Sequence, residues 1–283
     1  MAPGTTGTSN GAVNPSPLLA LPKELREMVY EFALTSAGGL ICVELESGRR
    51  GLCEPVDPLA VNSPVRELNQ LKYVCQQLYE ETKGQELRFN SVTFDVRFSG
   101  PNSTLTAEVL EFLDPVCDKW WKDIGNIHIT CPMVAAEAIV PANERHRLSF
   151  IIPGMTEQCI QLQEVCRAHP QITIYFELQG LDARLGEDFA YAVQSMHKSF
   201  RGSSIPGITD FFGRPHHELE VENRRKFCGD MDLPPNFRIM PQGVWDPLAF
   251  FKILSPFYQH LLDKTKARES TLSQIGGLYG TGF

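Results

Sequence analysis

The residue types that could do chemistry in this chain are few, and their spacing does not suit a site. His216 and His217 are adjacent histidines, and Asp230 and Asp232 lie close to Cys228. Neighbouring residues on a helix or a strand point in different directions, and no third ligand follows either pair at a useful spacing. We therefore predict that both groups are surface or loop residues and that the protein binds no metal and no cofactor.

Three other patterns could suggest a site but have a simpler interpretation. The ending GGLYGTGF imitates a glycine-rich phosphate loop, but no strand precedes it and no helix follows it, which indicates a flexible tail. Trp120 and Trp121 could frame a pocket, although core anchoring is the commoner role of tryptophans at helical spacing. The eight cysteines form no CxxC pair and have no basic neighbour that would mark a nucleophile, so we expect buried, reduced thiols. No catalytic motif is found, and the chain is predicted not to be an enzyme.

Length, composition and charge restrict the class of protein further. The chain has 283 residues, of which 42% are hydrophobic, and this is enough to bury a substantial core. Its formal net charge is -8, and its basic runs are too short for a phosphate-binding surface, which argues against nucleic acid as a partner. No segment is long and apolar enough to suggest a membrane span, and the first 22 residues lack the charge and the apolar core of a signal peptide. We expect an intracellular protein, cytoplasmic or nuclear, with protein partners.

The ordered part of the chain is predicted to begin with a helix. Residues 1–17 are mostly Gly, Pro, Ser and Thr and are expected to form a disordered tail. Pro22 suits the first turn of a helix that ends before Gly38. Tyr30 and Leu34 lie opposite its main apolar stripe, so a second body, from this chain or a partner, must cover one side. The main stripe, expected to pack on the core, consists of Leu21, Leu25, Met28, Val29 and Phe32.

A short strand is predicted over residues 40–45, followed by a proline-containing loop and a second helix. Ser63 would cap that helix, Pro64 would occupy its first position, and the helix would continue towards Phe89. Its apolar side would be formed by Leu68, Leu71, Val74, Cys75, Leu78, Tyr79 and Thr82.

Residues 91–265 read as an α/β region. Strands are predicted at 91–98, 126–130 and 171–179, and helices at about 105–121, 155–168 and 185–200. Strands that alternate with helices indicate parallel neighbours joined by right-handed crossovers. Because all three strands alternate polar and apolar residues, helices are expected mostly on one face of a mainly parallel sheet. The predicted class is therefore α/β (or α+β).

The other face of that sheet is a candidate for target recognition. It should carry Arg97, His128, Tyr175 and Glu177, which include residue types that anchor protein interfaces. Equally, the long segment 201–243 could fold back and cover this face. Other polar residues predicted on it are Thr93, Asp95, Thr130 and Thr173.

The last part of the chain is predicted to be less regular. Residues 237–240 could form a short strand within the excursion 201–243, and a helix is expected over about 245–262 with a bend near Pro256. The residues from 266 to 283 are predicted to form a flexible tail.

The first two helical segments carry a resemblance. LLALPKELREMVYEFAL, followed by LNQLKYVCQQLYEET and by FNSVTF, resembles a family of F-box-like proteins of filamentous fungi, in which an LPxELRxxIY helix precedes a VCRQLYxET helix. The resemblance extends over residues 18–94 and places an F-box-like helical region with an inserted loop at 18–90. In true F-boxes this unit docks on the Skp adaptor of a cullin ubiquitin ligase. Carried over by position, the partner-binding residues would be Leu21, Pro22, Glu24, Leu25, Met28 and Val29.

Three functions follow as hypotheses. The resemblance implies an F-box-like protein-interaction module that acts as a substrate receptor, using the first helices for the ubiquitin ligase adaptor and the α/β region for a target. A stand-alone fungal interaction or scaffold protein could instead keep the helices only as a structural cap. An enzyme would need polar residues that come together only in the fold.

Overall fold

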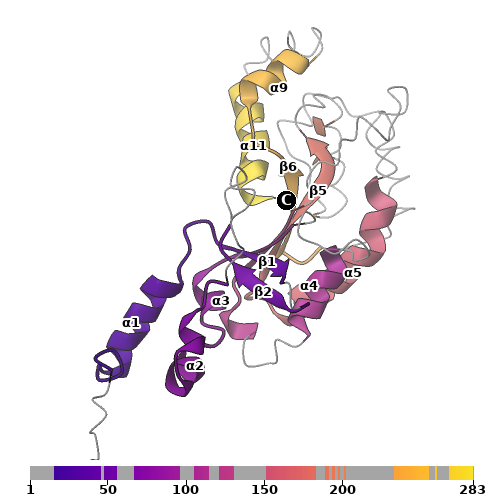
Figure 1. Ribbon diagram of the computed structural model, residues 1–283. Coiled ribbons are helices and arrows are strands. Elements are labelled where there is room, and N and C mark those ends of the chain that lie inside the picture. The colour runs from indigo at the N-terminus through magenta and orange to yellow at the C-terminus, as the bar shows by residue number, and fades with distance from the viewer. Residues whose placement is uncertain are drawn as a thin grey trace, which may run out of the picture.

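A computed structural model gives the fold of this chain. It describes residues 16–45, 48–55, 67–95, 105–114, 121–130, 151–182, 233–254 and 268–282, together with residues 189, 190, 193, 194, 197, 201 and 259. Within these residues the strands form one six-stranded sheet in the order β2-β1-β3-β4-β5-β6. The protein has an α/β fold, as the sequence predicted (Figure 1).

The sheet is parallel except at one edge. β1 (Leu40–Glu44) pairs antiparallel with β2 (Arg50–Cys53), and every later pair, from β1·β3 to β5·β6, is parallel. The three strands predicted from alternation are present as β3 (Val92–Asp95), β4 (Asn126–Thr130) and β5 (Thr173–Asp182). The short strand suggested at 237–240 is also present, as β6 (Phe237–Gln242).

The core lies between the sheet and the helices that cover its apolar face. From β3 onward each strand adds on the same side of its predecessor, an order for which right-handed crossovers favour connecting helices on one face. α4 (Leu105–Leu113) and α5 (Ile151–Ala168) lie there, and Phe94 meets Phe112 of α4 edge to face at 5.4 Å. Among the described residues of the strands, those with no exposed surface are Leu40, Val92, Ile127, Ile129, Ile174, Phe237 and Ile239.

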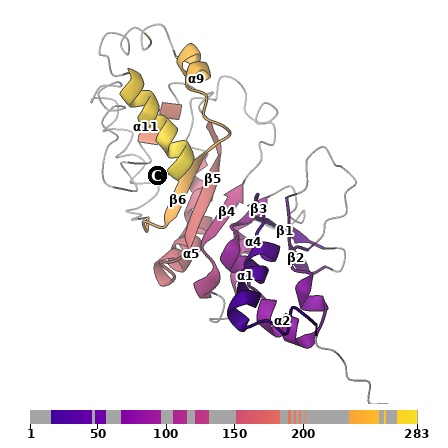
Figure 2. The same ribbon diagram turned by 90° about the vertical axis from the view of Figure 1, so that its left-hand side faces the viewer.

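The C-terminal segment is a helix, and the prediction of a flexible tail at 266–283 is wrong. α11 (Arg268–Thr281) packs against edge strand β6 and buries Ile275 and Leu278. It lies on the other side of the sheet from α5: Figure 1 shows α11 to the left of β5 and β6 and α5 to their right, and Figure 2 views the molecule from the side of α11. Tyr279 of α11 contacts Trp245, with ring centroids 5.5 Å apart, just before α9 (Pro247–Ile253). This aromatic packing stabilises the helix in spite of the glycines of α11.

The second predicted helix is broken into shorter pieces. Residues 56–66 lie outside the described part of the chain, and after them come η1 (Leu71–Tyr73), α2 (Gln76–Thr82) and α3 (Glu86–Phe89). Gly84, which separates α2 from α3, has a φ of 78°, a conformation that no helical residue adopts. The apolar side expected for one long helix is therefore divided: Leu78 is buried, whereas Val74 and Cys75 are exposed.

Two other predicted helices are only partly described. Residues 115–120, with the bend expected at Pro115, and most of the 185–200 segment lie outside the described residues, although Phe189 and Val193 are buried in the core. β2 was not predicted, because four residues, RGLC, carry too short a pattern to indicate a strand.

Candidate functional site

The candidate site is the exposed side of the first helix, α1 (Lys23–Leu34). The sequence predicted that its main apolar stripe would pack on the core, and this is wrong. Tyr30 and Leu34 are the buried residues, with 2% and 1% of their surface exposed. The stripe instead faces outward: Leu21 is 36% exposed, Leu25 46%, Met28 66%, Val29 39% and Phe32 88%.

The inward side of α1 contacts a small hydrophobic cluster that is separate from the sheet core. Tyr30 and Leu34 pack with Leu78 of α2. α1 packs on α2 and α3 rather than on the sheet, and the side that carries Tyr30 and Leu34 makes this contact. The wider stripe is therefore not covered by any apolar surface of the described chain. The partly buried residues around this cluster are Leu18, Leu19, Leu71 and Phe89.

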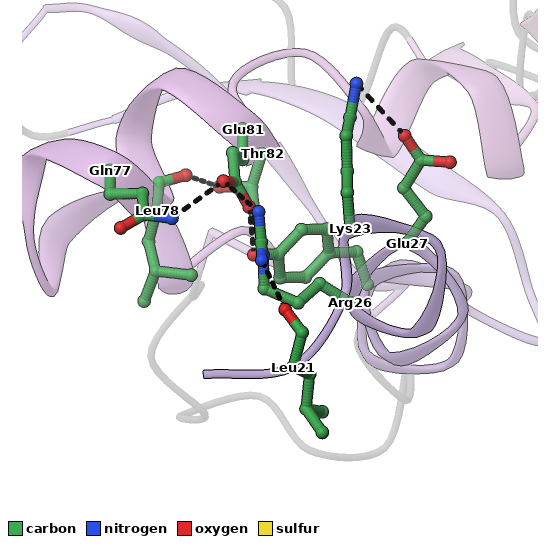
Figure 3. A network of polar contacts seen from close by, with 9 residues as sticks. Leu21, Lys23, Arg26, Glu27, Gln77, Leu78, Glu81 and Thr82 are labelled. Carbon is green, nitrogen blue, oxygen red and sulfur yellow. Dashed lines mark hydrogen bonds and ion pairs between the residues drawn. The ribbon is translucent and has the colours of Figure 1, made fainter. Parts of the chain in front are cut away.

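A polar joint, formed by Arg26, Tyr30, Gln77 and Glu81, holds α1 against α2 (Figure 3). The Arg26 guanidinium donates two hydrogen bonds to the Glu81 carboxylate, at 2.8 and 2.6 Å, and the Tyr30 hydroxyl donates a third at 2.6 Å. Gln77 adds a fourth donor at 2.9 Å. Arg26 also donates to the backbone carbonyl of Leu21 at 2.6 Å, which holds the residue before Pro22 in place. Two-pronged pairing of this kind restricts orientation as well as distance.

The buried amide of Asn90 attaches the ends of α1 and α3 to one another. Asn90 donates to the carbonyls of Leu34 and Glu86, at 2.6 and 2.8 Å, and accepts from the backbone N–H of Ser36 at 2.7 Å. The last carbonyls of a helix have no partner within the helix, so Asn90 replaces one that α1 lacks. Asn69 similarly donates to the Glu86 carboxylate at 2.8 Å.

The joint changes the pKa values of the groups that form it. The hydrogen bonds from Arg26, and then those from Tyr30 and Gln77, lower the pKa of Glu81 to about 2 in spite of partial burial. Burial, followed by the hydrogen bond to Glu81, raises the pKa of Tyr30 to about 12. At neutral pH Glu81 is therefore an anion held by a cation and a neutral phenol.

Acid is expected to weaken the joint. The pKa of Glu81 is lower in the folded chain than its ordinary value of 4.5. Its contribution to stability is therefore complete above about pH 4.5 and is lost as the pH falls towards about 2. Chemical denaturation of the wild type and of Glu81→Gln should show a difference in the free energy of unfolding that shrinks over this range. A difference that stays constant from pH 6 to about pH 3 would contradict the role given to Glu81.

The residues that carry the sequence resemblance fall into two structural sets. Arg26 and Tyr30 of the first motif meet Leu78 and Glu81 of the second, and Asn90 of the third segment closes the unit. These are internal contacts. Leu34 is also buried. All six residues predicted to bind a partner are on the surface: Leu21, Pro22, Glu24, Leu25, Met28 and Val29.

Sequence reasoning did not find the joint between the two motifs. Arg26 and Glu81 are 55 residues apart, and nothing in either helix indicates that they pair. The available signal was the presence of an Arg and a Tyr four residues apart on the side of α1 opposite to its main stripe.

The second predicted surface, the polar face of the sheet, is formed in part. His128 and Tyr175 are register partners on β4 and β5, and their rings stack with centroids 4.6 Å apart and planes 7° apart. His128, Tyr175 and Glu177 are all half-buried, and Asp95 is buried, so this face is less open than predicted. Arg97 lies outside the described residues.

Burial of this polar face also favours uncharged side chains. It lowers the pKa of His128 and raises the pKa of Glu177; the charge of Asp95 raises the latter further, while a hydrogen bond with the backbone of Gly243 lowers it. Both shifts favour the neutral form.

The described residues hold no cluster of three or more His, Cys, Asp or Glu side chains that could bind a metal ion. His216, His217, Cys228, Asp230 and Asp232 are outside the described ranges. In the part of the chain that the structure covers, no helix has the length and hydropathy needed to cross a membrane.

The structure is thus an α/β protein whose first helix, α1, is fixed to α2 and α3 on one side and exposed on the other. In comparisons with known proteins, no family model matches the chain, and neither a curated protein nor a solved structure matches it significantly.

Proposed function

We propose that this chain is an F-box-like protein-interaction module whose helix α1 docks on the Skp adaptor of a cullin-type ubiquitin ligase. In this proposal the α/β region presents a target to the ligase. The observation that carries the proposal is the exposed apolar stripe of α1. The stripe exposes five large apolar side chains, although Arg26 and Tyr30 anchor the other side of the helix. A contiguous apolar patch of this kind is unusual on a surface that binds no partner.

The anchoring of α1 supports docking rather than local disorder. A helix that binds through one face loses less freedom on binding when its other face is already fixed. The joint with Glu81 and the contact of Arg26 with the Leu21 carbonyl hold the Leu-Pro step and the stripe in one arrangement. The docking residues in this proposal are the six exposed motif residues named above, together with Phe32.

Replacement of Leu25 and Met28 by glutamine should abolish binding to the purified Skp adaptor, measured by calorimetry, or weaken it by about tenfold or more. The fold should persist, since both side chains are exposed and exposed substitutions usually change stability by about 0.5 kcal/mol or less. Leu248→Gln with Ile253→Gln is the matched control, because these apolar side chains are also exposed but lie in α9, away from α1 (Figure 1).

Two results would count against the proposal. The first is a wild-type protein that does not bind the adaptor, which would favour a stand-alone interaction protein. The second is equal binding by the α1 variant and the α9 control, which would place any adaptor site elsewhere.

A further inference from the structure

The charges beside the apolar stripe of α1 are distributed unevenly. At about 100° per residue, Glu24 and Glu31 lie together on one border of the stripe, and Glu27 lies just beyond them. All three are exposed. Lys23 is their nearest cation along the helix, and it forms an exposed pair with Glu27 at 3.6 Å. The stripe therefore has an acidic border on this side.

The other border of the stripe offers no free charge. Ala33 lies next to the stripe there, followed by Arg26, whose guanidinium is bound to Glu81 and to the Leu21 carbonyl. Beyond Arg26 the helix turns inward to Tyr30 and Leu34. A partner on the exposed side of α1 thus meets an apolar strip with carboxylates along one edge only.

We propose that the partner surface for α1 is an apolar protein surface bordered on one side by lysine or arginine residues. This inference rests on the proposed function that α1 is the docking helix, and it adds the charge and the orientation of what docks. Complementary charges at the rim of an interface mainly set the association rate, the salt dependence and the orientation of the partner. If the partner carried cations on both sides of its apolar surface, the cations on one side would face no carboxylate of α1.

The same border distinguishes a protein partner from a membrane. Amphipathic helices that lie on anionic membranes carry Lys and Arg on their polar face. Glu24 and Glu31 beside the stripe, together with Glu27 further round the helix, would be repelled by the negative surface of such a membrane. The geometry therefore favours a cationic protein surface.

The test uses two labelled amphipathic peptides, one of leucine and lysine and one of leucine and glutamate, with binding followed by fluorescence anisotropy. The full-length wild type should bind the leucine–lysine peptide, and the affinity should fall as salt rises from about 0.05 to 0.5 M. Glu24→Gln, Glu27→Gln and Glu31→Gln together should weaken binding about tenfold, the size expected for three exposed ion pairs. Leu25→Gln with Met28→Gln should also weaken it.

The matched control neutralises three exposed carboxylates elsewhere, with Glu54→Gln, Glu164→Gln and Glu269→Gln, and has the same net charge as the α1 variant. It should bind the peptide as the wild type does. Equal weakening by both triple variants, no binding to the leucine–lysine peptide, equal binding of the leucine–glutamate peptide, or α1-dependent binding to phosphatidylserine vesicles would each overturn the inference. If these peptide results are as expected but the Skp adaptor does not bind, only the choice of adaptor fails.

Discussion

Replacing Asn90 with alanine is expected to lower the free energy of unfolding by about 2 to 4 kcal/mol. The side chain is 8% exposed and makes three hydrogen bonds with the backbone, to the Leu34 and Glu86 carbonyls and from the Ser36 N–H. Alanine leaves the Leu34 and Glu86 carbonyls and the Ser36 N–H without this partner, and water reaches the buried position of Asn90 poorly. An unpaired buried polar group costs about 1 to 3 kcal/mol.

Asn126→Ala is the control for this prediction. Asn126 is exposed at the start of β4, so its loss should change the free energy of unfolding by about 0.5 kcal/mol or less. Urea denaturation of the two variants would compare them directly. Similar midpoints for Asn90→Ala and the wild type would show that α1 does not depend on this amide.

Gly276→Ala is expected to destabilise the protein by about 1 to 3 kcal/mol, the usual cost of an overpacked core position. A Cβ atom at this position would lie 2.6 Å from Nε1 of Trp245 and 2.9 Å from Cδ1. Trp245 also contacts Phe250 and Tyr279, with ring centroids 5.3 and 5.5 Å away, so its ring has little room to move. The missing side chain of Gly276 is what lets α11 approach the indole.

The neighbouring glycine should respond in the opposite direction. Nothing lies within 4 Å of a Cβ atom built on Gly277, which is exposed in the same helix. Gly277→Ala should therefore raise the free energy of unfolding by about 0.5 to 1 kcal/mol, because alanine favours the helix. Thermal unfolding measures both effects. Destabilisation by both alanines, or by neither, would contradict the packing of α11 on Trp245.

The central strands could be predicted from sequence because each one carries its own signal. In β3 and β4, and over residues 173–177 of β5, buried residues alternate with more exposed ones at the two-residue period of a strand over most of the length described. β2 has no such signal. It consists of four residues, and its place depends on antiparallel pairing with β1, a contact that only the folded chain supplies.

The candidate site shows a different limit of prediction. Helical periodicity identified the stripe of Leu21, Leu25 and Met28, but periodicity cannot say which side of a helix its own chain will cover. The buried side was decided by Arg26, Tyr30 and Leu34 through contacts with residues more than 40 positions away. The C-terminal helix was missed for a related reason: three glycines disfavour a helix locally, and contacts of Tyr279 with Phe189 and Trp245 outweigh them.

The order of the strands has a consequence for how the chain folds during synthesis. Because β3, β4, β5 and β6 occupy successive places in the sheet, each new strand can be added to the edge left by the one before it as the ribosome delivers it. The longest wait falls between β5, which ends at Asp182, and β6, which starts at Phe237. During that interval the open edge of β5 is the natural target for wrong pairing and for chaperones.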